Sequence, residues 1–149
     1  YRTAKLALAL GFRVVAYDPT PKIKHPDVSL VELRTVLSQS DVISLHVPLT
    51  EQTRHLLNRE AIQSLKPGCI LINTSRGGII DEVALLEALE AGHLGGAAID
   101  VFAEEPLKAN SPLMACENVV LTPHIAGVTQ DSNQRVSDMI ADLILQHFA

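Results

Sequence analysis

The chain has 149 residues, enough for one domain with a single core that buries about two thirds of the unfolded surface. Its residues are 47% hydrophobic and 19% charged, which is typical of a globular protein and excludes a disordered or fibrous chain. The net charge of -5 and the scattered Lys and Arg side chains argue against a nucleic-acid partner. No apolar run reaches the roughly 18 residues of a membrane span and no signal-peptide pattern opens the chain, so we expect a cytoplasmic protein without membrane contact.

Helices and strands are expected to alternate along the chain. Good helix formers at 2–10 end at Gly11, and the β-branched and aromatic run at 12–17 predicts a strand. Ser29 and Glu32 have the spacing of a capping box, which predicts a helix from there to Ser38. The later elements are expected to be a strand at 41–47, a short helix capped by Asn58 and ending before Pro67, a strand at 69–73, a helix at 82–91 capped by Asp81, strands at 95–101 and 118–123, and a helix from Thr129.

The last two of these helices carry a mostly apolar face at helical spacing. The face comprises Val83, Leu86, Leu89 and Glu90 in the first, and Val136, Met139, Ile140, Leu143 and Ile144 in the second. We expect the final helix to cover the last strand. Because the strands are continuously apolar, the pattern predicts an α/β fold with a parallel sheet covered on both faces.

Polar side chains stand where the expected strands end. The strand ends hold, in order, Asp18; Val47 and Pro48; Thr74, Ser75 and Arg76; Asp100; and His124. Because the carboxyl ends of parallel strands meet at one edge, where such sheets bind their ligands, we expect these residues to form a shared site.

Each of these residues also has an explanation that needs no ligand. Asp18 is either a turn former before Pro19 or an acceptor for ribose hydroxyls. Arg76 is either a solvated surface group or a planar fork for a carboxylate. His124 alone would fit a hydrogen-bonded core histidine, and Glu105 a solvated charge. The two cysteines and six histidines lack metal-ligand spacing, so we expect no metal site.

Three linked motifs, NTSRGGIIDE, GAAIDVFAEEPL and NVVLTPHIAG, occur in this order. Together they resemble the nucleotide-binding domain of the D-isomer-specific 2-hydroxyacid dehydrogenases, with D-3-phosphoglycerate dehydrogenase as the nearest branch. The resemblance covers essentially the whole chain and implies a Rossmann-type, doubly wound parallel sheet. It further implies NAD as cofactor, a small 2-hydroxy or 2-oxo acid as substrate, and a homodimer for the full-length enzyme.

The resemblance assigns roles to individual residues. Arg76 matches the arginine that holds the substrate carboxylate, His124 the general acid and base, and Glu105 the carboxylate that pairs with that histidine. Such a pair suits ketone reduction, since a proton must reach the oxygen near neutral pH. Asp18 matches the acid of the adenosine ribose site, and Asp100 the acid that contacts the nicotinamide carboxamide. The other cofactor positions are Pro48, Thr53, Thr74, Ser75 and Gly127.

The cofactor preference rests on Asp18. An acid at this strand end repels a 2'-phosphate, which favours NAD over NADP, although Lys22 and Lys24 follow a few residues on.

No G-x-G-x-x-G pattern occurs in the chain. In the family this loop and its strand would lie just upstream of Tyr1, so the resemblance predicts that 1–149 is an NAD-binding-domain fragment lacking its first strand, its glycine-rich turn and the substrate domain. The missing strand is expected between the strands that end at Asp18 and Pro48, leaving unpaired backbone edges. We therefore expect the isolated segment to be inactive or nearly so.

Other functions remain open. A glyoxylate or hydroxypyruvate reductase of the same family fits this half equally well, because most substrate contacts come from the other domain. Formate dehydrogenases of this fold have a glutamine in place of Glu105, which counts against them. An NAD-sensing corepressor would bind the nucleotide without efficient turnover, and a protein that docks partners through its last helix is the weakest alternative.

Overall fold

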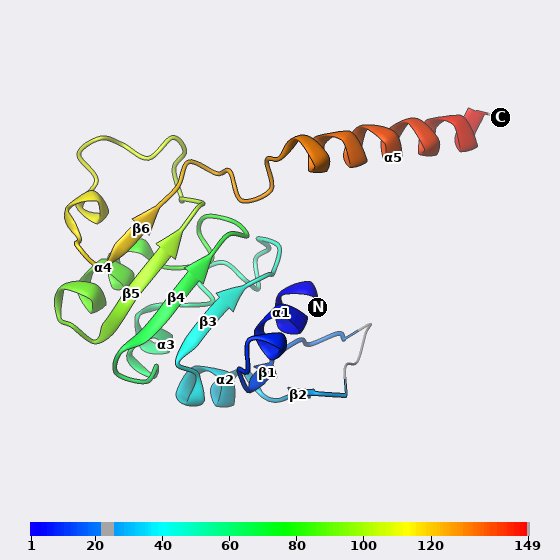
Figure 1. Ribbon diagram of the computed structural model, residues 1–149. Helices are drawn as coiled ribbons and strands as arrows, with labels where there is room; N and C mark the ends of the chain where they lie inside the picture. Colours follow the sequence, from blue (N-terminus) through cyan, green and yellow to red (C-terminus); the bar gives the residue numbers. More distant parts are fainter. Residues whose placement is uncertain (22–25, 149) are drawn as a thin grey trace.

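The computed structural model describes residues 1–21 and 26–148 and has an α/β fold (Figure 1). Lys22 and Lys24 lie outside the described residues. All strand pairs are parallel. The elements are α1 (Arg2–Ala9), β1 (Val14–Ala16), β2 (Val28–Leu30), α2 (Leu33–Gln39), β3 (Val42–Leu45), α3 (Arg59–Gln63), β4 (Cys69–Asn73), α4 (Glu82–Glu90), β5 (Leu94–Ile99), the 3-10 helix η1 (Pro112–Ala115), β6 (Val119–Leu121) and α5 (Gln130–Phe148).

The strands form two sheets. Four strands pair in the order β3-β4-β5-β6, and in the described part of the chain β1 pairs with β2 alone. No ladder joins β1 to β3 among the described residues, so the discontinuity lies where the sequence places it, between the strands that lead to Asp18 and Pro48. The parallel strands with intervening helices confirm the predicted Rossmann-type α/β fold.

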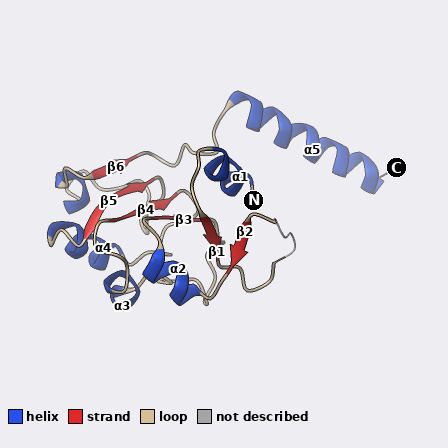
Figure 2. Ribbon diagram, turned by 60° about the horizontal axis from the view of Figure 1, so that its bottom comes forward, coloured by secondary structure: helices blue, strands red, loops and turns tan. Residues whose placement is uncertain are grey.

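Helices lie on both sides of the strands, but the expected cover on both faces is not complete: Val42, Ile70 and Val120, on one face of the four-stranded sheet, are exposed. Figure 2 shows α2, α3 and α4 beneath the strands and α1 on the opposite side. The core lies between α2 to α4 and the four-stranded sheet, where Leu71, Ile79 and Leu85 are fully buried. Burying a side chain of this size contributes about 1.5 to 3 kcal/mol, so this cluster fixes the strand ends that carry the polar residues.

Two predicted helix caps are confirmed. The side chain of Asn58 accepts a hydrogen bond from the Ala61 amide, and that of Asp81 accepts from the amides of Val83 and Ala84. The predicted apolar face of α4 is correct in part. Leu89 is buried and Leu86 packs against the core, whereas Val83 and Glu90 are exposed. Ala84 and Leu85 are buried in their place.

The predicted capping box is wrong. Ser29 lies in strand β2, where it pairs with Val15, so its backbone is committed to a parallel ladder. The helix begins later, at Leu33, and its N-cap Glu32 makes no side-chain capping hydrogen bond. The apolar run around Ser29 favours an extended chain that can pair with β1, and this pairing outweighs the local capping signal.

The predicted position of the last helix is also wrong. α5 runs away from the body of the molecule and has no buried residue (Figure 1). Its apolar side chains, including Met139 and Leu143, are exposed and do not cover β6. None of the described helices is both long and apolar enough to cross a membrane.

Candidate active site

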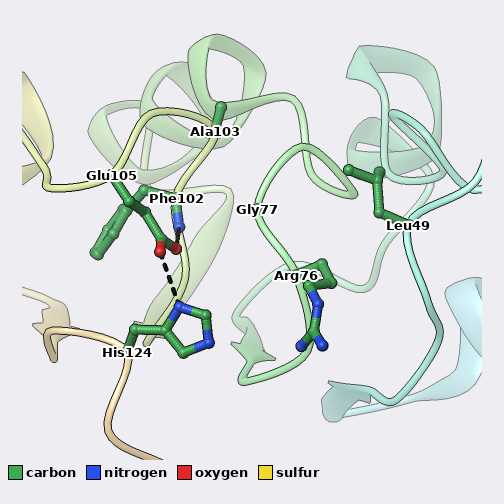
Figure 3. Close-up of a pocket in the computed structure, with 7 residues that line it drawn as sticks. All are labelled: Leu49, Arg76, Gly77, Phe102, Ala103, Glu105 and His124. Carbon is green, nitrogen blue, oxygen red and sulfur yellow. Dashed lines mark hydrogen bonds and ion pairs between the residues drawn. The ribbon is translucent and has the colours of Figure 1, made fainter.

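Two cavities open beside the loops that follow the strands. The first has a volume of about 310 Å³ and is lined by Leu49, Arg76, Gly77, Phe102, Ala103, Glu105 and His124 (Figure 3). The second has a volume of about 330 Å³ and is lined by His46, Val47, Pro48, Ser75 and Arg76. Arg76 belongs to both linings, so it stands between the two spaces.

Glu105 and His124 form a hydrogen-bonded pair in the first cavity. The His124 Nδ1 and the Glu105 Oε2 are 2.8 Å apart, and the other carboxylate oxygen accepts from the Phe102 amide at 2.9 Å. The bond from His124, followed by that from Phe102, lowers the pKa of Glu105. Since an ionised carboxylate only accepts, Nδ1 carries the proton. The Nε2 atom points away from Glu105 toward the side of the cavity where Arg76 lies (Figure 3).

A buried carboxylate holds the loop that carries His124. Asp100, only 3% exposed, accepts from the Thr122 hydroxyl at 2.6 Å and from the Ile125 and Ala126 amides at 2.8 and 2.9 Å. The Asp100 carbonyl also accepts from the His124 amide at 2.8 Å. These bonds enclose His124, whose φ of 55° lies in the left-handed region that non-glycine residues rarely adopt.

Acid unfolding should report these hydrogen bonds. Burial raises the pKa of Asp100, but the bonds from Thr122, Ala126 and Ile125 outweigh it, so the pKa lies below its ordinary value. In the unfolded chain that value is about 3.9, so ionised Asp100 stabilises the fold above about pH 4, and this contribution is lost as pH falls through the native pKa. In urea titrations we expect Asp100→Asn to be less stable at neutral pH, with the difference shrinking on acidification. A difference that stays constant with pH would contradict this origin.

Arg76 sits in a short loop between β4 and α4 that a buried asparagine shapes. The Asn73 Nδ2 donates to the Arg76 carbonyl at 3.0 Å, and its Oδ1 accepts from the Ser75 amide and hydroxyl at 3.1 and 2.8 Å. The Arg76 Nη1 donates to the Ser75 carbonyl at 2.6 Å. Within the described residues the guanidinium has no carboxylate partner, so its fork is available to an anion.

Gly77 brings this loop against the loop that holds Glu105. A Cβ atom at Gly77 would lie 1.7 Å from the Phe102 carbonyl oxygen and 2.7 Å from the Ala103 amide nitrogen. Only a glycine permits this approach of two backbones. The contact sets the spacing between Arg76 and the Glu105–His124 pair.

The sequence matches a known protein family. A family model described as D-isomer specific 2-hydroxyacid dehydrogenase, NAD binding domain, matches residues 1–126. The chain belongs to this family. The strand-end residues therefore lie in a domain of the type that this family uses to bind NAD.

Relatives named for several different substrates resemble this chain. It is 50% identical to (S)-sulfolactate dehydrogenase of Chromohalobacter salexigens over 143 residues, which cover 93% of the chain and 46% of that protein. It is 45% identical to hydroxypyruvate reductase of Thermotoga maritima over 145 residues, covering 96% of the chain and 47% of that protein. For D-3-phosphoglycerate dehydrogenase of Archaeoglobus fulgidus the identity is 41% over 148 residues, covering 97% and 28%. The sequence predicted that D-3-phosphoglycerate dehydrogenase is the nearest branch, but these identities do not single that branch out.

A solved structure of the family superposes closely. D-lactate dehydrogenase from Aquifex aeolicus, complexed with NAD and lactic acid, gives a TM-score of 0.85 at 35% identity and covers 99% of this chain and 49% of that chain. The chain thus spans about half the length of this structure and less than half of the relatives above.

Only some of the residues that the resemblance assigns to the cofactor line a cavity. Pro48 and Ser75 line the second cavity, whereas Asp18, Thr53, Thr74, Asp100 and Gly127 line neither cavity. The Thr53 hydroxyl donates to the Pro48 carbonyl at 2.6 Å and so closes the loop after β3. One oxygen of Asp18 accepts from the Thr20 amide at 2.9 Å, the geometry of a turn former. Its role toward ribose stays a prediction.

Sequence reasoning missed several residues of the site. Asn73 ends an apolar strand directly before the arginine loop, and a lone amide there is the signal that could have revealed it. His46 lines the second cavity and hydrogen-bonds the Ser44 hydroxyl at 2.9 Å, and burial lowers its pKa.

Among the described residues, no group of three or more His, Cys, Asp or Glu side chains could hold a metal ion.

Proposed function

We propose that this chain is the NAD-binding domain of a longer dehydrogenase that transfers a hydride between NAD(H) and a 2-oxo acid or D-2-hydroxy acid. The observation that carries the proposal is one cavity bearing Arg76, Glu105 and His124, with the histidine ring bonded to the acid at 2.8 Å. The first strand, the glycine-rich turn, the substrate domain and a second copy in a homodimer belong to the proposed full-length enzyme.

The residues of the edge fit a dinucleotide. Val47 and Pro48 supply an apolar wall to the second cavity and Ser75 a polar one, a combination suited to a heterocyclic ring with an amide. Asp18 is exposed beyond the end of β1 and has acceptor capacity beyond its bond to Thr20, as ribose hydroxyls need. This acid also supports our proposal that the enzyme prefers NAD to NADP.

The side chains supply binding and proton transfer. When bound, NADH supplies the hydride. Arg76 holds the substrate carboxylate through two parallel hydrogen bonds and so orients the ketone. His124 donates a proton from Nε2 to the ketone oxygen, while Glu105 stabilises the imidazolium before the proton leaves. In the reverse direction the neutral Nε2 accepts the hydroxyl proton.

We infer a substrate of two or three carbons. The relatives named for sulfolactate, hydroxypyruvate and phosphoglycerate all act on three-carbon acids with a polar third carbon. Within this class, the motifs favour 3-phosphohydroxypyruvate, while hydroxypyruvate, glyoxylate and 3-sulfopyruvate are alternatives. In the first cavity Arg76 is the single guanidinium and is assigned to the carboxylate, so a phosphate or sulfonate would need a cation from outside the described lining.

Turnover by the full-length enzyme tests this proposal. The loss of NADH absorbance is followed with each of the four oxo acids above, and then with NADPH in place of NADH. We expect one or more of them to be reduced, with a higher kcat/KM for NADH than for NADPH, and no turnover by residues 1–149 alone. Tight NADH binding without reduction of any oxo acid would instead support an NAD-sensing binding protein.

A further inference from the structure

The first residue of α4 reaches across to the opposite wall of the first cavity. The Glu82 Oε1 accepts a hydrogen bond from the Ala103 amide at 2.6 Å, a contact between residues 21 apart in the sequence. The helix does not need this carboxylate for capping, because the neighbouring Asp81 already accepts from the amides of Val83 and Ala84. Glu82 is thus free to bind elsewhere, and it is half-buried by doing so.

The segment that Glu82 holds is the one that carries Glu105. Two consecutive amides of this loop are bound by carboxylates: Phe102 by Glu105 itself at 2.9 Å, and Ala103 by Glu82. Residues 103–106 are all exposed and belong to no helix or strand. These four residues therefore have little packing to hold them, so the two carboxylate contacts act together with the contact of Gly77 and Phe102 to position Glu105.

The hydrogen bond from the Ala103 amide to Glu82 also connects the loop of Arg76 with the loop of Glu105. Arg76 and Glu82 lie at the two ends of one short segment that begins at the end of β4 and enters α4, with Gly77 pressed against the Phe102 carbonyl. On the other side of the cavity, Glu105 orients the His124 ring. A brace from Glu82 to Ala103 thus fixes the arginine loop relative to the acid–histidine pair.

We propose that Glu82 is a positioning residue for the reaction: its hydrogen bond to the Ala103 amide holds Glu105, and through it His124, at a fixed distance from Arg76. Glu82 is not itself a lining residue, and it acts on the site only through its bond to the Ala103 amide. The inference rests on the proposed function. It differs from a purely local role, in which an acid in the first turn only interacts favourably with the helix dipole.

Three variants of the full-length enzyme separate these roles. Glu82→Ala removes the brace, and Glu82→Gln keeps an oxygen that accepts from the amide. Glu60→Ala removes the matching first-turn acid of α3, which is exposed. We expect Glu82→Ala to lower kcat by about ten- to a hundredfold, since small displacements of reacting groups have effects of this size. The NADH dissociation constant should stay unchanged, Glu82→Gln should recover most of kcat, and Glu60→Ala should retain all of it.

Amide hydrogen exchange supplies a measurement that does not depend on turnover. Peptides covering 101–106 should exchange faster in Glu82→Ala than in the unsubstituted protein or in Glu60→Ala. An unchanged kcat in Glu82→Ala, no recovery in Glu82→Gln, or unchanged exchange in 101–106 would overturn the positioning role. Absence of turnover in the unsubstituted enzyme would overturn the proposed function instead. The exchange rates of 101–106 would then still show whether Glu82 holds this loop in place.

Discussion

Replacing His124 with glutamine in the full-length enzyme is expected to lower kcat by about 10² to 10⁴-fold, the usual contribution of a general acid or base. Glutamine can still hydrogen-bond Glu105, but it cannot exchange a proton near neutral pH. The affinity for NADH should not change, because His124 lies in the first cavity, whereas Asp18, which is assigned to the adenosine side, follows β1 of the two-stranded sheet. Steady-state kinetics and an NADH titration measure the two quantities separately.

His93→Gln provides the matched control. The His93 Nε2 bonds the Ile62 carbonyl at 3.1 Å, a bond that a glutamine amide can replace, and His93 precedes β5 at the sheet edge opposite the site. This variant should keep its full kcat. If His124→Gln reduced oxo acids as fast as this control, another group would have to deliver the proton, and the role of the Glu105–His124 pair would be wrong.

Gly77→Ala should damage stability and turnover together. The new methyl group would lie 1.7 Å from the Phe102 carbonyl oxygen and 2.1 Å from its carbon. Both are backbone atoms, so no change of rotamer relieves the overlap, and the two loops must separate. Overpacking of this kind costs about 1 to 3 kcal/mol or more. The separation also moves Arg76 away from His124, which should lower kcat/KM by about a hundredfold.

The stability part of this prediction has its own control. A Cβ atom at Gly127 would meet no other atom within 4 Å, and its φ is not left-handed, so Gly127→Ala should leave the free energy of unfolding unchanged. Urea unfolding of both variants is the measurement. Equal unfolding midpoints for the two variants would show that the loops of Gly77 and Phe102 can separate without loss of stability. Another contact would then have to set the distance between Arg76 and His124.

The parts of the fold that follow from local chemistry were predictable. The caps at Asn58 and Asp81 depend on side chains that bond amides two or three residues away, so a short stretch of sequence contains the whole interaction. Ser29 shows the limit of that logic, because the same local pattern is overridden by pairing with Val15 in β1. The apolar face of α5 was visible in the sequence, but what covers a face is a tertiary property, and within the described residues nothing does.

In the site, too, some residues could be predicted from the sequence and others could not. Arg76, Glu105 and His124 were found because motifs mark them, and the structure brings all three to one cavity. The supporting contacts were not found: Asp100 binds residues 22 to 26 positions away, and Glu82 binds one 21 positions away. Hydrophobic periodicity does not reveal contacts between residues so far apart in the sequence, because these contacts form only when the parallel strands pair and bring their carboxyl ends together.

The backbone of His124 carries a further consequence. A non-glycine residue at a φ of 55° costs about 1 to 3 kcal/mol, and glycine would remove most of that cost. The proposed proton donor therefore occupies a position at which glycine would make the fold more stable. Any selection of variants for thermal resistance only, without an assay for turnover, should drift toward glycine at this position and discard the chemistry first.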